Sequence, residues 1–265
     1  MNFFERYNER ARKLQSLVCV GLDSAYEKLP ERFYKATNPQ LEFNKFCINE
    51  TNSQVSAYKI NTAFYEARGF EGIEAMKKTV EYIHEKFSDI MVIGDAKRAD
   101  IGSTNEAYAQ ALFDELGFDA VTLNPYLGSE TLEPFLKRED KGCFILCRTS
   151  NPGAGEFQDM KIAGEPLWLH IARHVNIWNR NKNCGLVVGA TYPEEMRIAR
   201  AACPDLTFLV PGIGAQGGDV AQVVGVGTQK GNALSEMAGG LIINSGRAII
   251  FAEKPGLEAL KLKNE

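Results

Sequence analysis

An acid, a base and a second acid are closely spaced in the stretch Asp95-Ala-Lys97-Arg-Ala-Asp100. The stretch follows an apolar run at residues 90–93, so it continues a predicted strand. Side chains two residues apart share one face of a strand, which puts Asp95 and Lys97 on the same side, with Asp100 just past the strand end. Desolvating three ionisable groups is costly unless they pair. We therefore interpret this stretch as the centre of an active site.

The same stretch leads into a predicted helix at residues 107–116. Ser103 is a candidate N-cap, and Glu106 follows it by three residues, the spacing of a capping box. The ionisable groups are thus expected where a parallel strand passes into a helix.

Lys59, on a neighbouring predicted strand, adds a second base to this set. Without it, Asp95 and Lys97 could be an ordinary ion pair at the end of a strand. With it, two lysines and two aspartates can form an alternating network in which each lysine keeps its neighbours ionised. Such a network could hold an ammonium group in place in a largely enclosed site.

A glycine-rich segment, Pro211-Gly-Ile-Gly-Ala-Gln-Gly217, matches the GxGxxG pattern of dinucleotide-binding loops. Its context is unlike theirs, because it follows the seventh predicted strand, and the next residues, 223–228, look interrupted by glycines rather than helical. We expect instead a loop whose backbone N–H groups approach a phosphate. A plain turn-rich loop is the alternative.

A second candidate phosphate site is Asn244-Ser-Gly246-Arg247, at the start of the last predicted helical region. Backbone donors, a helix N-terminus and a guanidinium group together suit an anion. A surface arginine at a helix start is the alternative.

Eight apolar, strand-like runs alternate with helical patterns along the chain, which is typical of a parallel sheet. The runs lie at residues 17–23, 57–61, 90–93 with the motif that follows, 120–124, 143–147, 185–189, 207–210 and 240–244, and helices are expected at 3–14, 71–87, 107–116, 130–137, 166–180 and 193–202. Eight such units in 265 residues have the size of a (β/α)₈ barrel. We expect one α/β domain over residues 1–265, with a doubly wound open sheet as the alternative.

Polar residues gather where these strands end, which in (β/α)₈ barrels is the side that carries the active site. They include Asp23, Lys59, Asn61, Asp95, Lys97, Thr149, Ser150, Asn151, Gln216, Gly246 and Arg247. The opposite ends of the strands show no comparable set of polar residues. We therefore expect the active site at the carboxyl-terminal mouth of the barrel.

Composition narrows the class of protein. A net charge of −4 without a basic tract argues against nucleic-acid and anionic-membrane partners, and no apolar run approaches a membrane span. The six cysteines form no CxxC pair and are expected to be buried thiols in a cytoplasmic protein. His170 and His174 have the spacing of a metal-binding helix, but no third ligand is evident, so surface histidines are expected there.

Taken together, these residues resemble the orotidine 5′-phosphate decarboxylase family. The resemblance rests on Asp95-Ala-Lys-Arg-Ala-Asp-Ile-Gly-Ser-Thr104, on Val20-Gly-Leu-Asp23, on Pro211-Gly-Ile-Gly-Ala-Gln-Gly-Gly-Asp219 and on Gly246-Arg247. The form Thr149-Ser-Asn-Pro-Gly153 is similar to the longer bacterial and parasite-type branch. The resemblance implies a (β/α)₈ barrel of the ribulose-phosphate-binding type that converts orotidine 5′-phosphate to UMP as a homodimer, without a metal or cofactor.

The resemblance also implies roles for individual residues. Lys97 would protonate C6 as carbon dioxide leaves, and Lys59, Asp95 and Asp100 would complete the network. Asp100, Ile101 and Thr104 would reach the partner subunit's site. The expected substrate contacts are Asp23 and Asn61 at the ribose, Ser150 at the pyrimidine, Gln216, Gly246 and Arg247 at the phosphate, and Pro211 beside them.

Two other functions compete with this interpretation. Sugar-phosphate decarboxylases and aldolases on related barrels share Asp-x-Lys-x-x-Asp but hold an enediolate with magnesium. Their metal needs an acidic ligand on the second strand, where this chain has Lys59. The other candidate is an inactive barrel that only binds nucleotide phosphates.

Overall fold

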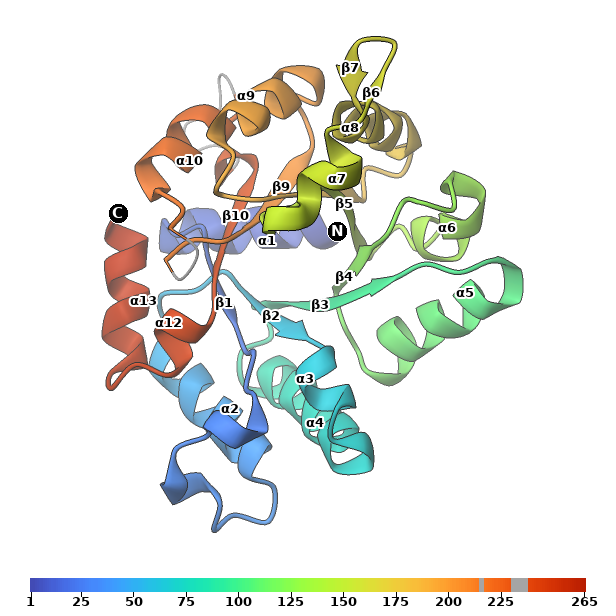
Figure 1. Cartoon of the computed structure of the whole chain (residues 1–265). Coiled ribbons are helices and arrows are strands. Elements are labelled where there is room, and N and C mark those ends of the chain that lie inside the picture. The colour runs from blue at the N-terminus through green and yellow to red at the C-terminus, as the bar shows by residue number, and fades with distance from the viewer. Residues whose placement is uncertain (215–216, 230–237) are drawn as a thin grey trace.

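Eight parallel strands close into a barrel in the computed structural model, which describes residues 1–214, 217–229 and 238–265 (Figure 1). Around the barrel the strands follow the order β1-β10-β9-β8-β5-β4-β3-β2. Their bounds are β1 (Val18–Gly21), β2 (Ala57–Asn61), β3 (Met91–Arg98), β4 (Ala120–Leu123), β5 (Gly142–Arg148), β8 (Cys184–Val188), β9 (Thr207–Pro211) and β10 (Leu241–Ser245). The predicted (β/α)₈ barrel is confirmed, and the open sheet is wrong.

Helices surround the strands, which are buried and apolar along most of their length, as expected for a sheet covered on both faces (Figure 1). They are α1 (Phe3–Leu14), α2 (Pro39–Thr51), α3 (Ala63–Glu66), α4 (Gly69–Lys86), α5 (Gly102–Ala109), α6 (Ser129–Leu136), α7 (Gly155–Gln158), α8 (Leu167–Trp178), α9 (Pro193–Ala202), α10 (Val220–Gly227), α12 (Arg247–Ile250) and α13 (Pro255–Asn264). A π-helical turn, Gln110–Glu115, continues α5. Helices α2, α3, α7 and α13 were not predicted, nor was the small hairpin of β6 (Lys161–Ile162) and β7 (Glu165–Pro166).

Helix α1 closes the amino-terminal end of the barrel. Asn2 and Glu5 form a capping box that starts the helix. Its buried Phe3 packs edge-to-face on Phe144 of β5, and the Tyr7 hydroxyl donates to the carbonyl oxygen of Leu241 at the start of β10 (2.9 Å). The carboxyl-terminal mouth, where the polar residues gather, lies at the other end.

The predicted start of α5 was wrong. The helix begins at Gly102 with Ile101 as N-cap, and no side chain caps it. The Asp100 N–H donates to the Asn105 side chain (2.9 Å), and the Asp100 carboxylate accepts the N–H of Ile101 (2.8 Å). Ser103 lies inside the helix rather than at its N-cap, and Glu106 pairs with Lys137 (2.9 Å).

The prediction that residues 223–228 are not helical was also wrong, because α10 covers most of them. Asp219 starts this helix by accepting the N–H of Gln222 (2.7 Å). Gly227 lies where a β-carbon would come within 2.8 Å of the Met196 sulfur, so this glycine serves close packing rather than a break. A dinucleotide-binding unit is excluded by position, because the GxGxxG loop follows β9 of a closed barrel.

Candidate active site

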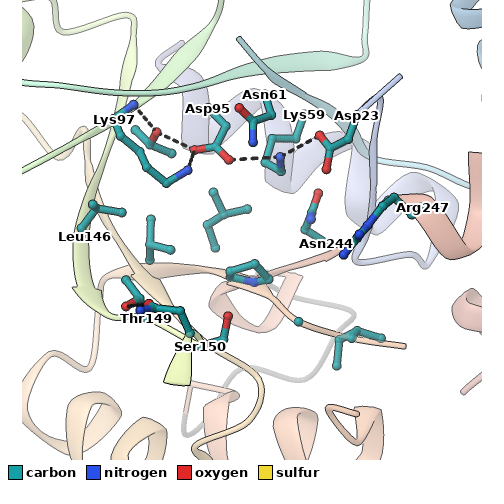
Figure 2. A pocket seen from close by; sticks show the side chains of 18 of the residues that line it. Asp23, Lys59, Asn61, Asp95, Lys97, Leu146, Thr149, Ser150, Asn244 and Arg247 are labelled. Atoms are coloured by element: carbon teal, nitrogen blue, oxygen red, sulfur yellow. Dashed lines mark hydrogen bonds and ion pairs between the residues drawn. The ribbon is translucent and has the colours of Figure 1, made fainter. Parts of the chain in front are cut away.

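A cavity of about 460 Å³ opens at the carboxyl-terminal ends of the barrel strands. Figure 2 shows Lys97, Asp95, Lys59 and Asp23 in a row along one wall, with Thr149 and Ser150 across from them. Arg247 lies at the Asp23 end of the row. Leu146, Val187, Leu209 and Ile213 supply apolar surface to the same cavity. A mostly apolar pocket with a few converging charges is the usual form of a small-molecule site.

Asp95 is the centre of the charged row. Its Oδ1 accepts the Lys97 ammonium at 2.6 Å and the Thr122 hydroxyl at 2.8 Å, while its Oδ2 accepts the Lys59 ammonium at 3.2 Å. Lys59 also reaches Asp23 Oδ1 at 3.4 Å. The side chains of Asp95, Lys97 and Lys59 therefore lie together, as predicted.

Burial and charge act in opposite directions on this row. Burial alone would raise the pKa of Asp95, but Lys59 and then Lys97 outweigh it and hold that pKa well below its ordinary value. Burial alone would lower the pKa of Lys59, yet Asp23 and Asp95 raise it above its ordinary value. Each charge is thus kept by its neighbours, although the Lys59 side chain is only 5% exposed.

Lys97 differs from Lys59 in its exposure and in its backbone. Its side chain is 48% exposed, so its ammonium has access to solvent as well as to Asp95. Its φ is +48°, in the left-handed region that non-glycine residues rarely adopt. Unusual backbone of this kind often occurs at functional sites, where the surrounding structure must hold it.

The wall across from the charged row follows β5. Gln158 accepts the N–H of Thr149 (2.9 Å) and donates to the Thr149 hydroxyl (2.9 Å), which fixes the backbone just before Ser150. Gly189 leaves room for this turn, because a β-carbon there would lie 2.9 Å from the Ser150 nitrogen. Ser150 is thereby presented to the cavity from a well-held loop.

The Arg247 end of the cavity is built from backbone and one guanidinium group. Gly246 packs against Gly21 and Asp23, and Arg247 follows it as the first residue of α12. Arg247 is exposed and forms no ion pair with any described residue. Gly212 and Gly214, with φ of +105° and +77°, turn the loop after β9 beside it. This end could accept an anion.

The structure brings most of the predicted site residues to one cavity: Asp23, Lys59, Asn61, Asp95, Lys97, Ser150, Pro211, Gly246 and Arg247. Asp100, Ile101 and Thr104 do not line it. Asp100 and Ile101 lie in the loop between β3 and α5, and Thr104 lies in the first turn of α5. Ile101 is 64% exposed, and Thr104 is exposed too. Gln216 lies outside the described residues.

Two polar residues of the cavity, Thr122 and Gln158, were not predicted, whereas Asn244 belongs to the predicted phosphate segment Asn244-Ser-Gly246-Arg247. Thr122 is the single polar side chain of an otherwise apolar strand, which was a usable signal. Asn244 is 7% exposed, and its Oδ1 accepts no hydrogen bond in the described structure, so a ligand could supply the missing donor. Nothing in the sequence marked Gln158.

The described residues contain no group of three or more His, Cys, Asp or Glu side chains that could hold a metal ion. His170 donates to the Ile162 carbonyl (2.9 Å), and His174 donates to the His170 carbonyl (2.8 Å), both on the helix surface as predicted. The six cysteines are buried and free. No helix in the described part of the chain is long and apolar enough to cross a membrane.

Comparison with known proteins gives a consistent result. The family model described as "Orotidine 5′-phosphate decarboxylase / HUMPS family" matches residues 16–262. An orotidine 5′-phosphate decarboxylase from Herpetosiphon aurantiacus is 48% identical over 94% of this chain and 90% of its own length. Leishmania donovani OMP decarboxylase superposes with a TM-score of 0.87 at 37% identity, covering 100% of this chain and 97% of its own.

The structure of Leishmania donovani UMP synthase is also similar, with a TM-score of 0.89 at 38% identity over 100% of this chain. The match covers 55% of that longer chain. The family match, which extends over nearly all of the sequence, agrees with the barrel and with the motifs that line its mouth. The chain therefore belongs to the orotidine 5′-phosphate decarboxylase / HUMPS family.

Proposed function

We propose that this chain converts orotidine 5′-phosphate to UMP, the last step of pyrimidine nucleotide synthesis, with no metal or organic cofactor. The observation that carries the proposal is Asp95 held between Lys59 and Lys97 at the mouth of the barrel. The family to which the chain belongs and the names of its relatives supply the substrate.

The cavity offers complementary groups to each part of this substrate. Arg247, Gly246 and the loop after Pro211, with Gln216 in it, would bind the phosphate. Asp23 and Asn61 would contact the ribose, and Ser150 would contact the pyrimidine edge from the opposite wall. The C6 carboxylate would then lie against Asp95 and Lys97.

Loss of carbon dioxide from C6 leaves an electron pair in the plane of the ring, where the ring delocalises it poorly. A fixed ammonium group close to C6 stabilises that developing charge without having to reorganise. The C6–carboxylate bond breaks, its electron pair remains on C6, and Lys97 donates a proton there. Lys97, which is partly exposed, recovers a proton from water.

Asp95 has two effects in this scheme. It holds the Lys97 ammonium in place, and its negative charge repels the substrate carboxylate until carbon dioxide leaves. We assign the larger effect to the fixed ammonium, because an interaction that strengthens in the transition state accelerates the reaction directly. Binding of the remote phosphate can supply energy that helps to organise the site for the reaction at C6.

Lys59 argues against the magnesium-dependent alternative. Its ammonium lies 3.4 Å from Asp23 and 3.2 Å from Asp95, between the carboxylates that a divalent ion would otherwise bind. Two cations at that position would repel each other. The buried free cysteines fit a reducing compartment, and we place the reaction in the cytoplasm.

We also propose a homodimer in which Asp100, Ile101 and Thr104 complete the partner's site. In Figure 1 the segment between β3 and α5 extends outward from the barrel. Ile101 there, and Tyr126 and Leu127 after the adjacent strand β4, are 64%, 90% and 45% exposed. Large apolar side chains gathered at one edge are typical of an interaction surface. We treat residues 1–265 as one catalytic domain of this dimer.

Replacing Lys97 with alanine should lower turnover of orotidine 5′-phosphate by more than about a thousandfold, because the proton donor and the fixed positive charge are both lost. The loss of substrate absorbance measures the rate, and circular dichroism checks the fold. Lys78→Ala, on the outer face of α4, is the matched control and should keep wild-type turnover. Near-normal turnover in Lys97→Ala would contradict the assigned role.

Mixing two inactive variants, Lys97→Ala and Asp100→Ala, should restore activity. In a heterodimer one of the two sites receives Lys97 from one subunit and Asp100 from the other. Random mixing makes half of the dimers hybrid, so about a quarter of wild-type activity is expected. If verified heterodimers show no recovery, Asp100 does not act across the interface.

The low pKa of Asp95 predicts a pH-dependent stability. The ionised carboxylate stabilises the fold above its ordinary pKa of 3.8, and this contribution is lost as the pH falls toward its lower value in the folded state. The advantage of the wild type over Asp95→Asn in free energy of unfolding should therefore shrink by about 1 kcal/mol between pH 6 and pH 3. Urea unfolding measures it. A constant difference would mean that Asp95 titrates normally.

A further inference from the structure

Thr122 occupies an unusual position beside the charged row. It is the one polar residue of strand β4 (Ala120–Leu123), and it is 1% exposed. Its side chain reaches the cavity that contains Asp95 and Lys97. A buried hydroxyl needs hydrogen-bond partners, and the partners of Thr122 indicate what its side chain does in the site.

The pairing of β3 with β4 is irregular at this point. Gly94 is in register with Val121, and the next paired residues are Arg98 and Leu123. Three residues of β3, from Asp95 to Lys97, thus lie opposite the single residue Thr122. A bulge of this kind removes ladder hydrogen bonds and redirects side chains, and bulges are common next to active sites.

Thr122 replaces the hydrogen bonds that the bulge removes. Its Oγ1 accepts the backbone N–H of Lys97 at 3.0 Å and donates its own proton to Asp95 Oδ1 at 2.8 Å. Asp95 Oδ1 in turn accepts the Lys97 ammonium at 2.6 Å. The bonds form a closed ring that starts at the backbone of Lys97 and returns to its side-chain nitrogen.

This ring fixes both ends of Lys97. The backbone of Lys97 is held in its left-handed conformation, at φ +48°, which costs free energy unless contacts maintain it. The two donors on Oδ1, together with Lys59 on Oδ2, leave the Asp95 carboxylate little freedom to rotate. The direction of the Lys97 ammonium therefore depends on a hydroxyl that belongs to another strand.

We propose that Thr122 is a positioning residue, whose hydroxyl holds the bulged backbone of Lys97 and the carboxylate of Asp95 in the arrangement that aims the Lys97 ammonium at the substrate. The activity part of this inference rests on the proposed function. Two substitutions separate the shape of the Thr122 side chain from its hydrogen bonds. Valine keeps the shape of threonine but lacks the hydroxyl, whereas serine keeps the hydroxyl but lacks the methyl group.

The test compares Thr122→Val with Thr122→Ser. In Thr122→Val, kcat for orotidine 5′-phosphate should fall by about 10- to 100-fold, the scale of a lost hydrogen bond to a charged group, while KM stays within about threefold. Thr122→Ser should return kcat to within about threefold of the wild type. Thr207→Val, the same change at a buried position at the start of β9, is the control and should leave kcat unchanged.

Amide hydrogen exchange at Lys97, resolved by NMR, gives a second readout that does not need turnover. The Lys97 amide should exchange at least about tenfold faster in Thr122→Val than in the wild type, and at the wild-type rate in Thr122→Ser. A structural defect that is general would instead speed exchange throughout β3 and β4 in both variants.

The outcomes separate the two claims. If the wild type does not decarboxylate orotidine 5′-phosphate, the proposed function fails and the exchange measurement alone decides the role of Thr122. If folded Thr122→Val keeps wild-type kcat, or Thr122→Ser is equally impaired, the hydroxyl does not position the network. A rise in KM at constant kcat would make Thr122 a substrate contact instead.

Discussion

A buried carboxylate held between two ammonium groups is the constraint on which the rest of the site depends. Asp95 and Lys59 are both largely removed from water, and neither would keep its charge there alone. Together with Asp23 and Lys97 they form a chain of alternating charges, so that each desolvation cost is offset by a neighbour. Removing any one member leaves another charge without compensation. The arrangement is therefore fixed before a ligand arrives, which is what electrostatic catalysis requires.

The barrel supplies this arrangement through strand register. Lys59 and Asp95 come from adjacent strands, where Lys59 is paired with Ile93 and Asn61 with Asp95. Gly94 has no room for a side chain, because Phe118 packs within 2.8 Å of where its β-carbon would be. That close packing lies just before the bulge which turns Lys97 toward the cavity. The opposite end of the barrel is covered by α1, so the chemistry is confined to one mouth.

Much of this could be predicted from the sequence because the signals are local. All eight strands were predicted to within a few residues, since each is a short apolar run. The contact between Asp95 and Lys97 was predicted from the two-residue period of a strand, although the strand is bulged there and Lys97 has a left-handed backbone. The start of α5 and the helix at Val220–Gly227 were predicted wrongly. The first depends on a hydrogen bond that the Asn105 side chain accepts from the Asp100 N–H, and the second on the close packing of Gly227. The role of Thr122 could not be seen, because it arises from a register shift between two strands.

The most direct test of the account is the loss of orotidine 5′-phosphate absorbance when EDTA-treated protein is added. The account predicts that metal-free protein produces UMP at the same rate as protein with added magnesium, because Lys97 and its neighbours provide the charge that the reaction needs. No turnover, or turnover of a sugar phosphate that only magnesium restores, would contradict it and would favour the metal-dependent reaction of related barrels.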